Sequence, residues 1–245
     1  MSGLLAVNVA MELEAQPFFN AMTVHETAEV AGLRLYLGSP REDNNPRSTM
    51  VLCISGIGLV NAARAATHML TTYDVDLLVS AGTAGGLAPE VNVGDVCVAT
   101  NLAFTDADAT VFGYERGQIP GSPAVFNGDD ETCDRVVRAG SSPLMDCAVE
   151  QGKALEPVIH TGQMLAGNSF ITQANVADTR EVFPHAVSTD MESTALAQVA
   201  HAYDVKFQSV RGISDLCGPA ADQDFHLDAE LAAARSAAVV LAALA

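Results

Sequence analysis

The chain has 245 residues, of which 49% are hydrophobic and 17% are charged, and its formal net charge is −18. A chain of this length can bury a large core. Such an acidic balance repels polyanions, and the lysines, Lys153 and Lys206, and the scattered arginines do not form a basic face. We therefore expect no nucleic-acid partner.

The sequence also argues against a membrane-spanning or a secreted protein. No segment approaches the roughly 20 apolar residues that a membrane helix needs. The N-terminus lacks a basic region, and Glu12 and Glu14 interrupt its apolar run, so it is not a signal peptide. The 5 cysteines are widely spaced without a CxxC pair, which is typical of reduced thiols. We expect a cytoplasmic protein with no membrane partner, no metal and no cofactor.

Apolar runs and helical periodicity alternate along the chain. Strands are predicted over residues 4–10, 33–37, 50–54, 76–80, 95–100, 158–162 and 205–210. Helices are predicted over residues 11–22, 61–70, 133–140 and 176–182, after the run 188–190, and over 227–245. Because no break in composition separates these elements, the pattern predicts one α/β domain over residues 1–245. We expect a three-layer α/β/α arrangement with a mixed central sheet.

Two acidic residues stand at positions that favour chemistry. Glu192 follows the cap-like run 188–190 and lies in the first turn of a predicted helix, where the helix dipole should keep it ionised. Asp215 comes after the strand 205–210, near the end of the sheet where ligands usually bind. From spacing alone, residues at these positions are more often a dipole partner and a turn or cap residue.

Glycine-rich turns are predicted after two strands, at residues 55–58 and 81–86. Neither matches the P-loop pattern, and the second resembles a dinucleotide motif only loosely. They are either tight turns or places where the backbone approaches a ligand.

The segment 106–121 contains Phe112 and Tyr114, although only 5% of the chain is aromatic. Aromatic side chains in an exposed loop suggest an interface or a ligand cover. A small satellite cluster explains them as well.

Several motifs resemble, in the same order, those of the 5′-methylthioadenosine/S-adenosylhomocysteine nucleosidases of the nucleoside phosphorylase-like superfamily. They are the segments 10–14 (AMELE), 81–87 (AGTAGGL), 106–121 (DADATVFGYERGQIPG), 191–195 (MESTA) and 211–215 (RGISD). The resemblance covers nearly the whole chain. It implies a nucleoside phosphorylase-like fold and hydrolysis of the N-glycosidic bond of adenine nucleosides, which releases adenine and a 5′-substituted ribose.

The resemblance also implies roles for the acidic residues. Glu14 would activate the attacking water, Asp215 would protonate the leaving adenine at N7, and Glu192 would bind the ribose hydroxyls. Arg211 and Ser214 would line the site and position Asp215.

Further binding residues follow from the same motifs. Phe170 would stack on adenine, and the backbone of Ile171 would read the purine edge. Phe112 and Tyr114 would lie at a homodimer interface and complete the partner's pocket for the 5′-substituent. The remaining substrate-binding residues are expected to be Met11, Ile57, Thr83, Ala84, Gly85 and Met191.

Two alternatives to hydrolysis fit the sequence less well. A purine nucleoside phosphorylase needs cationic ligands for phosphate, but residues 79–81 lack the arginine of that family, and Glu14 would repel phosphate. A non-catalytic nucleoside-binding module would not need three acidic residues. The chain departs from the nucleosidase pattern at Asn168, where aspartate is common, and at Ser193, where alanine is usual.

Overall fold

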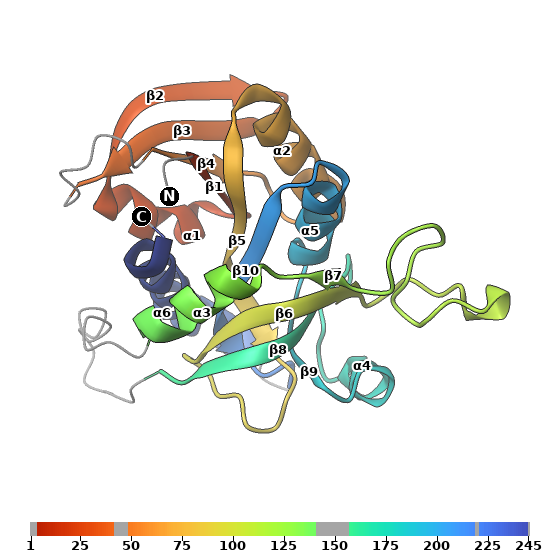
Figure 1. The fold of residues 1–245 in the computed structure, drawn as a ribbon. Coiled ribbons are helices and arrows are strands. Elements are labelled where there is room, and N and C mark those ends of the chain that lie inside the picture. The colour runs from red at the N-terminus through yellow and green to blue at the C-terminus, as the bar shows by residue number, and fades with distance from the viewer. Residues whose placement is uncertain (1–3, 42–48, 141–156, 219–220, 245) are drawn as a thin grey trace.

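The computed structural model describes residues 4–41, 49–140, 157–218 and 221–244, with side chains of the last range described from 229 to 243. Residues 42–48 lie outside these ranges, as do Cys147 and Lys153. A central sheet carries helices on both sides (Figure 1). This arrangement confirms the predicted α/β/α fold with a mixed sheet.

The strands of the sheet are β1 Leu4–Val9, β2 Met22–Val30, β3 Leu33–Pro40, β4 Met50–Ile54, β5 Val75–Gly86, β6 Val96–Phe104, β7 Phe126–Asn127, β8 Ile159–Ala166, β9 Ala186–Asp190 and β10 Lys206–Asp215. Seven of the strands, β1, β3, β4, β5, β6, β8 and β10, lie where the sequence predicts a strand. The helices are α1 Glu12–Ala21, α2 Leu59–Thr72, α3 Asp130–Gly140, α4 Val176–Val182, α5 Ser193–Ala202 and α6 Ala221–Leu244, with a 3-10 turn, η1, at Thr110–Phe112.

The sheet runs in the order β10-β6-β8-β9-β5-β1-β4-β3-β2, and β10 also pairs with β5. The pairings from β10 through β6, β8, β9 and β5 therefore return to β10 and close on themselves. Strands β1, β4, β5 and β10 are parallel to one another. Because parallel strands end at the same edge of a sheet, their carboxyl ends form one rim.

Two hydrophobic layers cover the sheet. On one face, Ala65 and Met69 of α2 and Leu196 of α5 pack on strand residues such as Leu78. On the other face, α1, α3 and α6 pack on the alternate strand residues, for example Phe18 of α1 beside Val79. Figure 1 shows α1, α3 and α6 on one side of the strands and α2 with α5 on the other. The site is thus built on a rigid, doubly covered sheet.

Four segments differ from the sequence prediction. The stretch 81–86, predicted as a turn, continues β5, and residues 211–215 continue β10 so that Asp215 is its last residue. The run 188–190, predicted as a helix cap, belongs to β9. Strand β2 was not predicted, because its residues are mostly polar and exposed at the edge of the sheet.

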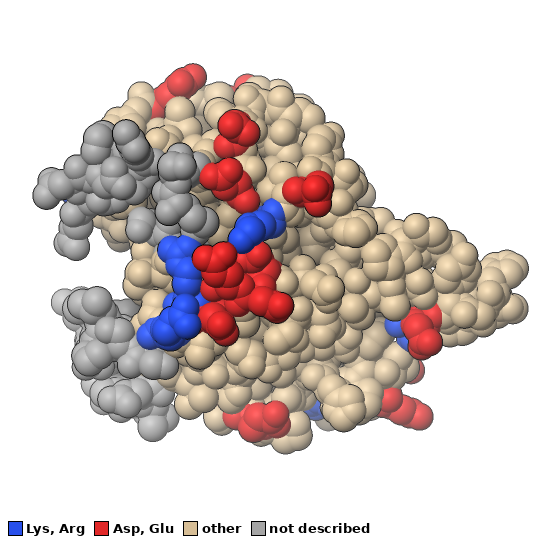
Figure 2. Space-filling view, viewed as in Figure 1, with Lys and Arg blue, Asp and Glu red and all other residues tan. Residues whose placement is uncertain are grey.

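The surface agrees with the acidic composition. On the face shown in Figure 2, Asp and Glu side chains gather over α3 beside a smaller group of Lys and Arg. None of the helices in the described part of the chain is long and apolar enough to cross a membrane.

Gly212 allows β10 to lie directly against α6. A Cβ atom at this position would come 2.0 Å from the carbonyl oxygen of Ala232. Since a helix backbone cannot move aside cheaply, Gly212→Ala should lower the free energy of unfolding by at least about 1–3 kcal/mol. Urea denaturation measures this loss.

Gly218→Ala is the control, because a Cβ atom there meets nothing closer than 4.0 Å. It should change stability by no more than about 0.5 kcal/mol. Equal stability of the two variants would contradict the close β10–α6 contact.

Candidate active site

A cavity of about 170 Å³ opens at the rim formed by the carboxyl ends of the parallel strands. Most of the predicted site residues line it, namely Met11, Glu14, Ile57, Thr83, Ala84, Gly85, Phe170, Ile171, Met191, Glu192, Ser214 and Asp215. Segments distant in sequence therefore meet at one place. Arg211, Phe112 and Tyr114 do not line the cavity.

Glu14 lies at the start of α1 with only 1% of its surface exposed. Its Oε2 accepts the backbone N–H of Ala10 at 2.8 Å and of Met11 at 3.1 Å. Its Oε1 accepts the N–H of Thr83 at 2.8 Å and the Thr83 hydroxyl at 2.9 Å. These four bonds tie α1 to β5 and fix the carboxylate at the cavity wall.

The glycines of β5 make room for these acidic groups. A Cβ atom on Gly82, whose φ is +128°, would lie 2.4 Å from Oε1 of Glu14. A Cβ atom on Gly85 would lie 2.5 Å from Sγ of Cys217 and 3.2 Å from Oδ1 of Asp215. The glycine-rich stretch thus serves close approach rather than a turn.

Glu192 is the N-cap residue of α5, but its side chain does not cap that helix. Its Oε1 instead accepts the N–H of Gly58 at 2.8 Å, immediately before α2. Burial raises the pKa of Glu192 to about 7, Arg211 opposes this rise, and Asp190 and Glu14 add to it. The expectation that the helix dipole keeps Glu192 fully ionised therefore underestimates burial.

Asp215 ends β10 with its carboxyl group at the cavity. Its Oδ1 accepts the N–H of Cys217 at 2.9 Å, and its Oδ2 lies 3.1 Å from the Ser214 hydroxyl. Burial raises the pKa of Asp215, and these two bonds only partly oppose it. A raised pKa favours the protonated carboxyl group that a proton donor requires.

Arg211 lies elsewhere than predicted. It is fully buried and does not contact Asp215. Its Nη1 lies 4.0 Å from Oε1 of Glu14, its Nε 3.4 Å from Oδ2 of Asp190, and its Nη2 3.5 Å from Oε2 of Glu192. Arg211 therefore lies beside the carboxylates of Glu14, Asp190 and Glu192. Of the two residues predicted to position Asp215, Ser214 contacts it and Arg211 does not.

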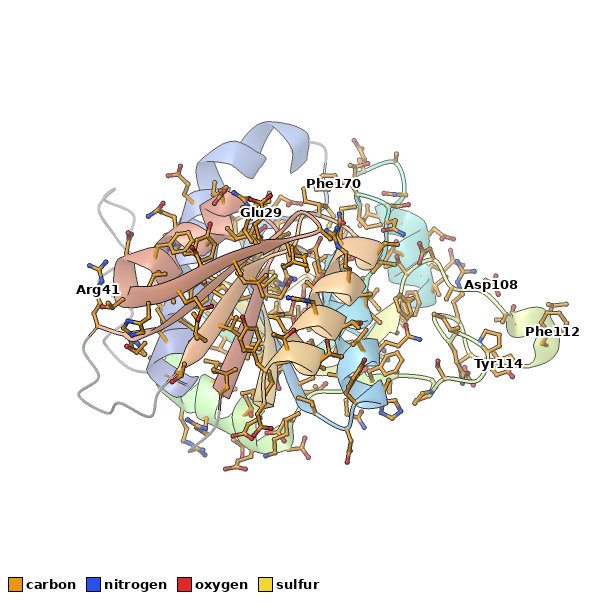
Figure 3. The ribbon with its side chains drawn as sticks, turned by 90° about the horizontal axis from the view of Figure 1, so that it is seen from above. Glu29, Arg41, Asp108, Phe112, Tyr114 and Phe170 are labelled. Carbon is orange, nitrogen blue, oxygen red and sulfur yellow. The ribbon has the colours of Figure 1, made fainter. Side chains whose placement is uncertain are left out.

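Phe112 and Tyr114 lie on the segment that projects from the molecule (Figures 1 and 3). Phe112 is 78% exposed at the end of η1. Figure 3 places both aromatic residues well away from Phe170, which stands at the cavity. Within one chain they do not complete the site.

Sequence reasoning missed other residues of the cavity. Asp190 and Thr189 of β9 and Cys217 line it, and burial raises the pKa of the Cys217 thiol to about 12. Asp190 was read only as part of a helix cap, although it stands two residues before Glu192. Among the described residues, no group of three or more His, Cys, Asp or Glu is arranged to hold a metal ion.

Asn168 sits close to the cavity, in the turn between β8 and Phe170. Its Oδ1 accepts the N–H of Leu59 at 3.1 Å. The amide thus makes the bond to the start of α2 that an aspartate at this position could also make.

Comparison with known proteins gives a consistent result. The profile of the phosphorylase superfamily matches residues 5–245. A 5′-methylthioadenosine/S-adenosylhomocysteine nucleosidase of Staphylococcus aureus is 32% identical over 238 residues, which is 97% of each chain.

Solved structures agree with this result. The nucleosidase of Neisseria meningitidis in complex with methylthio-immucillin-A has a TM-score of 0.85 and 32% identity, over 97% of this chain and 96% of that one. The Colwellia psychrerythraea enzyme in complex with adenine has a TM-score of 0.86 and 31% identity, over 100% and 95%. The chain belongs to the phosphorylase superfamily and, within it, to the 5′-methylthioadenosine/S-adenosylhomocysteine nucleosidases.

Proposed function

We propose that this protein hydrolyses the N-glycosidic bond of 5′-methylthioadenosine and S-adenosylhomocysteine, releasing adenine and the 5′-substituted ribose. The observation that carries the proposal is the convergence of Glu14, Glu192 and Asp215 on one cavity in a chain of this family. 5′-Deoxyadenosine and 6-amino-6-deoxyfutalosine are further candidate substrates, because they differ from these mainly beyond C5′.

The reaction needs three acidic groups in different states. Asp215, with its raised pKa, would give its proton to N7 as the bond between N9 and C1′ breaks. Glu192, ionised and held by Gly58, would bind the ribose hydroxyls and offset positive charge on the ring. Glu14 would orient water for attack on C1′ and take its proton. Phe170 and Ile171 would hold the base, and Met11 and Met191 would flank the ribose.

Hydrolysis is favoured over phosphorolysis by the charge of the site. Position 80 carries a serine, and this serine accepts a hydrogen bond from Arg211 at 2.6 Å. Arg211 is itself fully buried beneath the cavity and surrounded by carboxylates. It is therefore not available to bind a phosphate ion.

The first test follows the products. With 5′-methylthioadenosine and no phosphate, the protein should release adenine and free 5-methylthioribose, and added phosphate should not raise the rate. Chromatography of the products in both buffers measures this. Formation of a ribose 1-phosphate would replace the proposal by the phosphorylase alternative.

Asp215→Asn tests the proton donor. An amide can still donate a hydrogen bond but cannot transfer a proton, so kcat should fall by at least about 10²-fold while KM changes little. The comparison substrate is a ribosyl nitrophenolate, whose leaving group needs no proton and which should be nearly spared. An equal loss with both substrates would make Asp215 a positioning residue.

We further propose a homodimer in which the projecting segment 106–121 reaches the partner's site. In support, Val111 and Phe112 are 83% and 78% exposed, and exposed apolar residues, Ile57 and Phe170, stand at the cavity. Asp108, bonded to Thr110 and Arg116, holds the shape of the segment.

Replacing both Phe112 and Tyr114 by Ala should raise KM for 5′-methylthioadenosine more than for adenosine, because the lost contacts would be to the apolar 5′-substituent. Steady-state kinetics with the two substrates, together with light scattering, measures this. A fully active monomer, or unchanged selectivity, would contradict the dimer proposal.

We also propose that residues 1–245 act as one domain in the cytoplasm. The free cysteines among the described residues, Cys53, Cys97, Cys133 and Cys217, suit a reducing compartment. Cell fractionation that placed the protein outside the cytoplasm would contradict the location.

A further inference from the structure

The position of Arg211 depends on hydrogen bonds as well as on its ion pairs. Its distances to the carboxylates are 3.4 to 4.0 Å, and its Nε has no hydrogen-bond partner among the described residues. Its Nη2 donates to the hydroxyl of Ser80 at 2.6 Å, and its Nη1 to the carbonyl oxygen of Thr83 at 3.3 Å. Ser80 therefore makes the shortest contact that orients the guanidinium group.

Ser80 belongs to a cluster of three buried hydroxyl groups. Ser80 of β5 pairs with Ser209 of β10, and Ser193 begins α5 above them. The Ser193 Oγ lies 3.0 Å from Ser80 Oγ, 2.9 Å from Ser209 Oγ and 2.5 Å from Oδ2 of Asp190. All three serines are fully buried, and none lines the cavity.

The direction of each bond follows from the groups at the two ends. A guanidinium group only donates and a carboxylate only accepts. Ser80 therefore accepts from Arg211, and Ser193 gives its one proton to Asp190. Ser193 must then accept from both Ser80 and Ser209. One polarised chain runs from Arg211 through Ser80 and Ser193 to Asp190, with Ser209 as a side branch.

Asp190 connects this chain to Glu192. Its Oδ1 accepts the backbone N–H groups of Glu192 and Ser193, each at 2.8 Å. The chain thus joins the guanidinium group to the backbone segment that carries Glu192. The same network therefore contacts Arg211 at one end and the backbone of Glu192 at the other.

We infer that Ser80 and Ser193 are positioning residues for the nucleosidase reaction, which hold Arg211 against the carboxylates of Glu192 and Glu14 without touching the substrate. The inference rests on the proposed function.

The charged groups around Glu192 determine how its pKa would respond if the hydrogen-bond chain from Arg211 to Asp190 were broken. Glu192 faces Arg211 from β10, Asp190 from β9, Glu14 from α1 and the N–H of Gly58 before α2. Arg211 is the cation of this group and opposes the rise of the Glu192 pKa. If the guanidinium group is less well placed, the Glu192 pKa rises further. Since the reaction needs ionised Glu192, activity at low pH would be lost first.

The test compares Ser80→Ala and Ser193→Ala with Ser209→Ala. The control removes an equally buried hydroxyl but leaves the chain from Arg211 to Asp190 intact. We expect Ser80→Ala to lower kcat/KM for 5′-methylthioadenosine by roughly tenfold or more, the scale of a hydrogen bond to a charged group. Ser193→Ala should act in the same direction, and both should move the acid limb of the pH profile to higher pH. Ser209→Ala should leave the profile in place.

Two further results bear on the inference. Because Ser80 and Ser193 act in one chain, the double variant should lose less than the product of the single losses. If Ser80→Ala does not fold, Ser193→Ala alone tests the inference, and the acid limb of its pH profile is the measurement. A pH profile unchanged from wild type in both chain variants would overturn the inference while leaving the nucleosidase proposal standing. A wild-type protein that releases no adenine in the same assay would overturn both.

Discussion

Burial of Arg211 among Glu14, Asp190 and Glu192 is the constraint on which the site depends. Burial lowers the pKa of the guanidinium group, but the surrounding carboxylates outweigh it, so the pKa is raised overall. Removing one partner of such a group leaves an uncompensated buried charge, which is strongly destabilising. The carboxylates and the arginine are therefore interdependent, and their shared position organises the floor of the cavity.

This constraint also explains how two parts of the cavity differ. Glu14 and Glu192 stand over the arginine, in a charged and hydrogen-bonded part of the cavity. Asp215 stands apart from it, beside Cys217 and Ser214, where burial has no nearby cation to oppose it. The carboxyl groups of Glu192 and Asp215 thus have different environments within one pocket, which is the pattern expected when acidic residues have different tasks.

Much of this arrangement could be predicted from the sequence. Apolar runs located β1 and β4 because buried strands leave a strong signal, and the family resemblance directed attention to Glu14, Glu192 and Asp215. Two other kinds of feature were out of reach. The glycine stretch was read as a turn, because only its neighbours across the sheet show that Gly82 makes room for Glu14.

The environment of Arg211 was the second feature that the sequence could not show. Its neighbours in sequence suggested a contact with Asp215, because residues 211 and 215 would share one face of a regular strand. The pairing of β10 with β5 instead shifts register between Ile213 and Asp215, and Arg211 bonds to Ser80, which is 131 positions away in the chain. The serine cluster has no sequence signature, since single serines at wide spacing are common everywhere.

The strands β10, β6, β8, β9 and β5 close on themselves, and at the other end of the sheet β2 pairs only with β3 among the described strands. An unpaired strand edge can template aggregation with another copy. Here the edge carries exposed Glu26 and Glu29. Negative charges facing negative charges disfavour strand-to-strand addition. The charge on β2 therefore disfavours aggregation of copies of the chain through this edge.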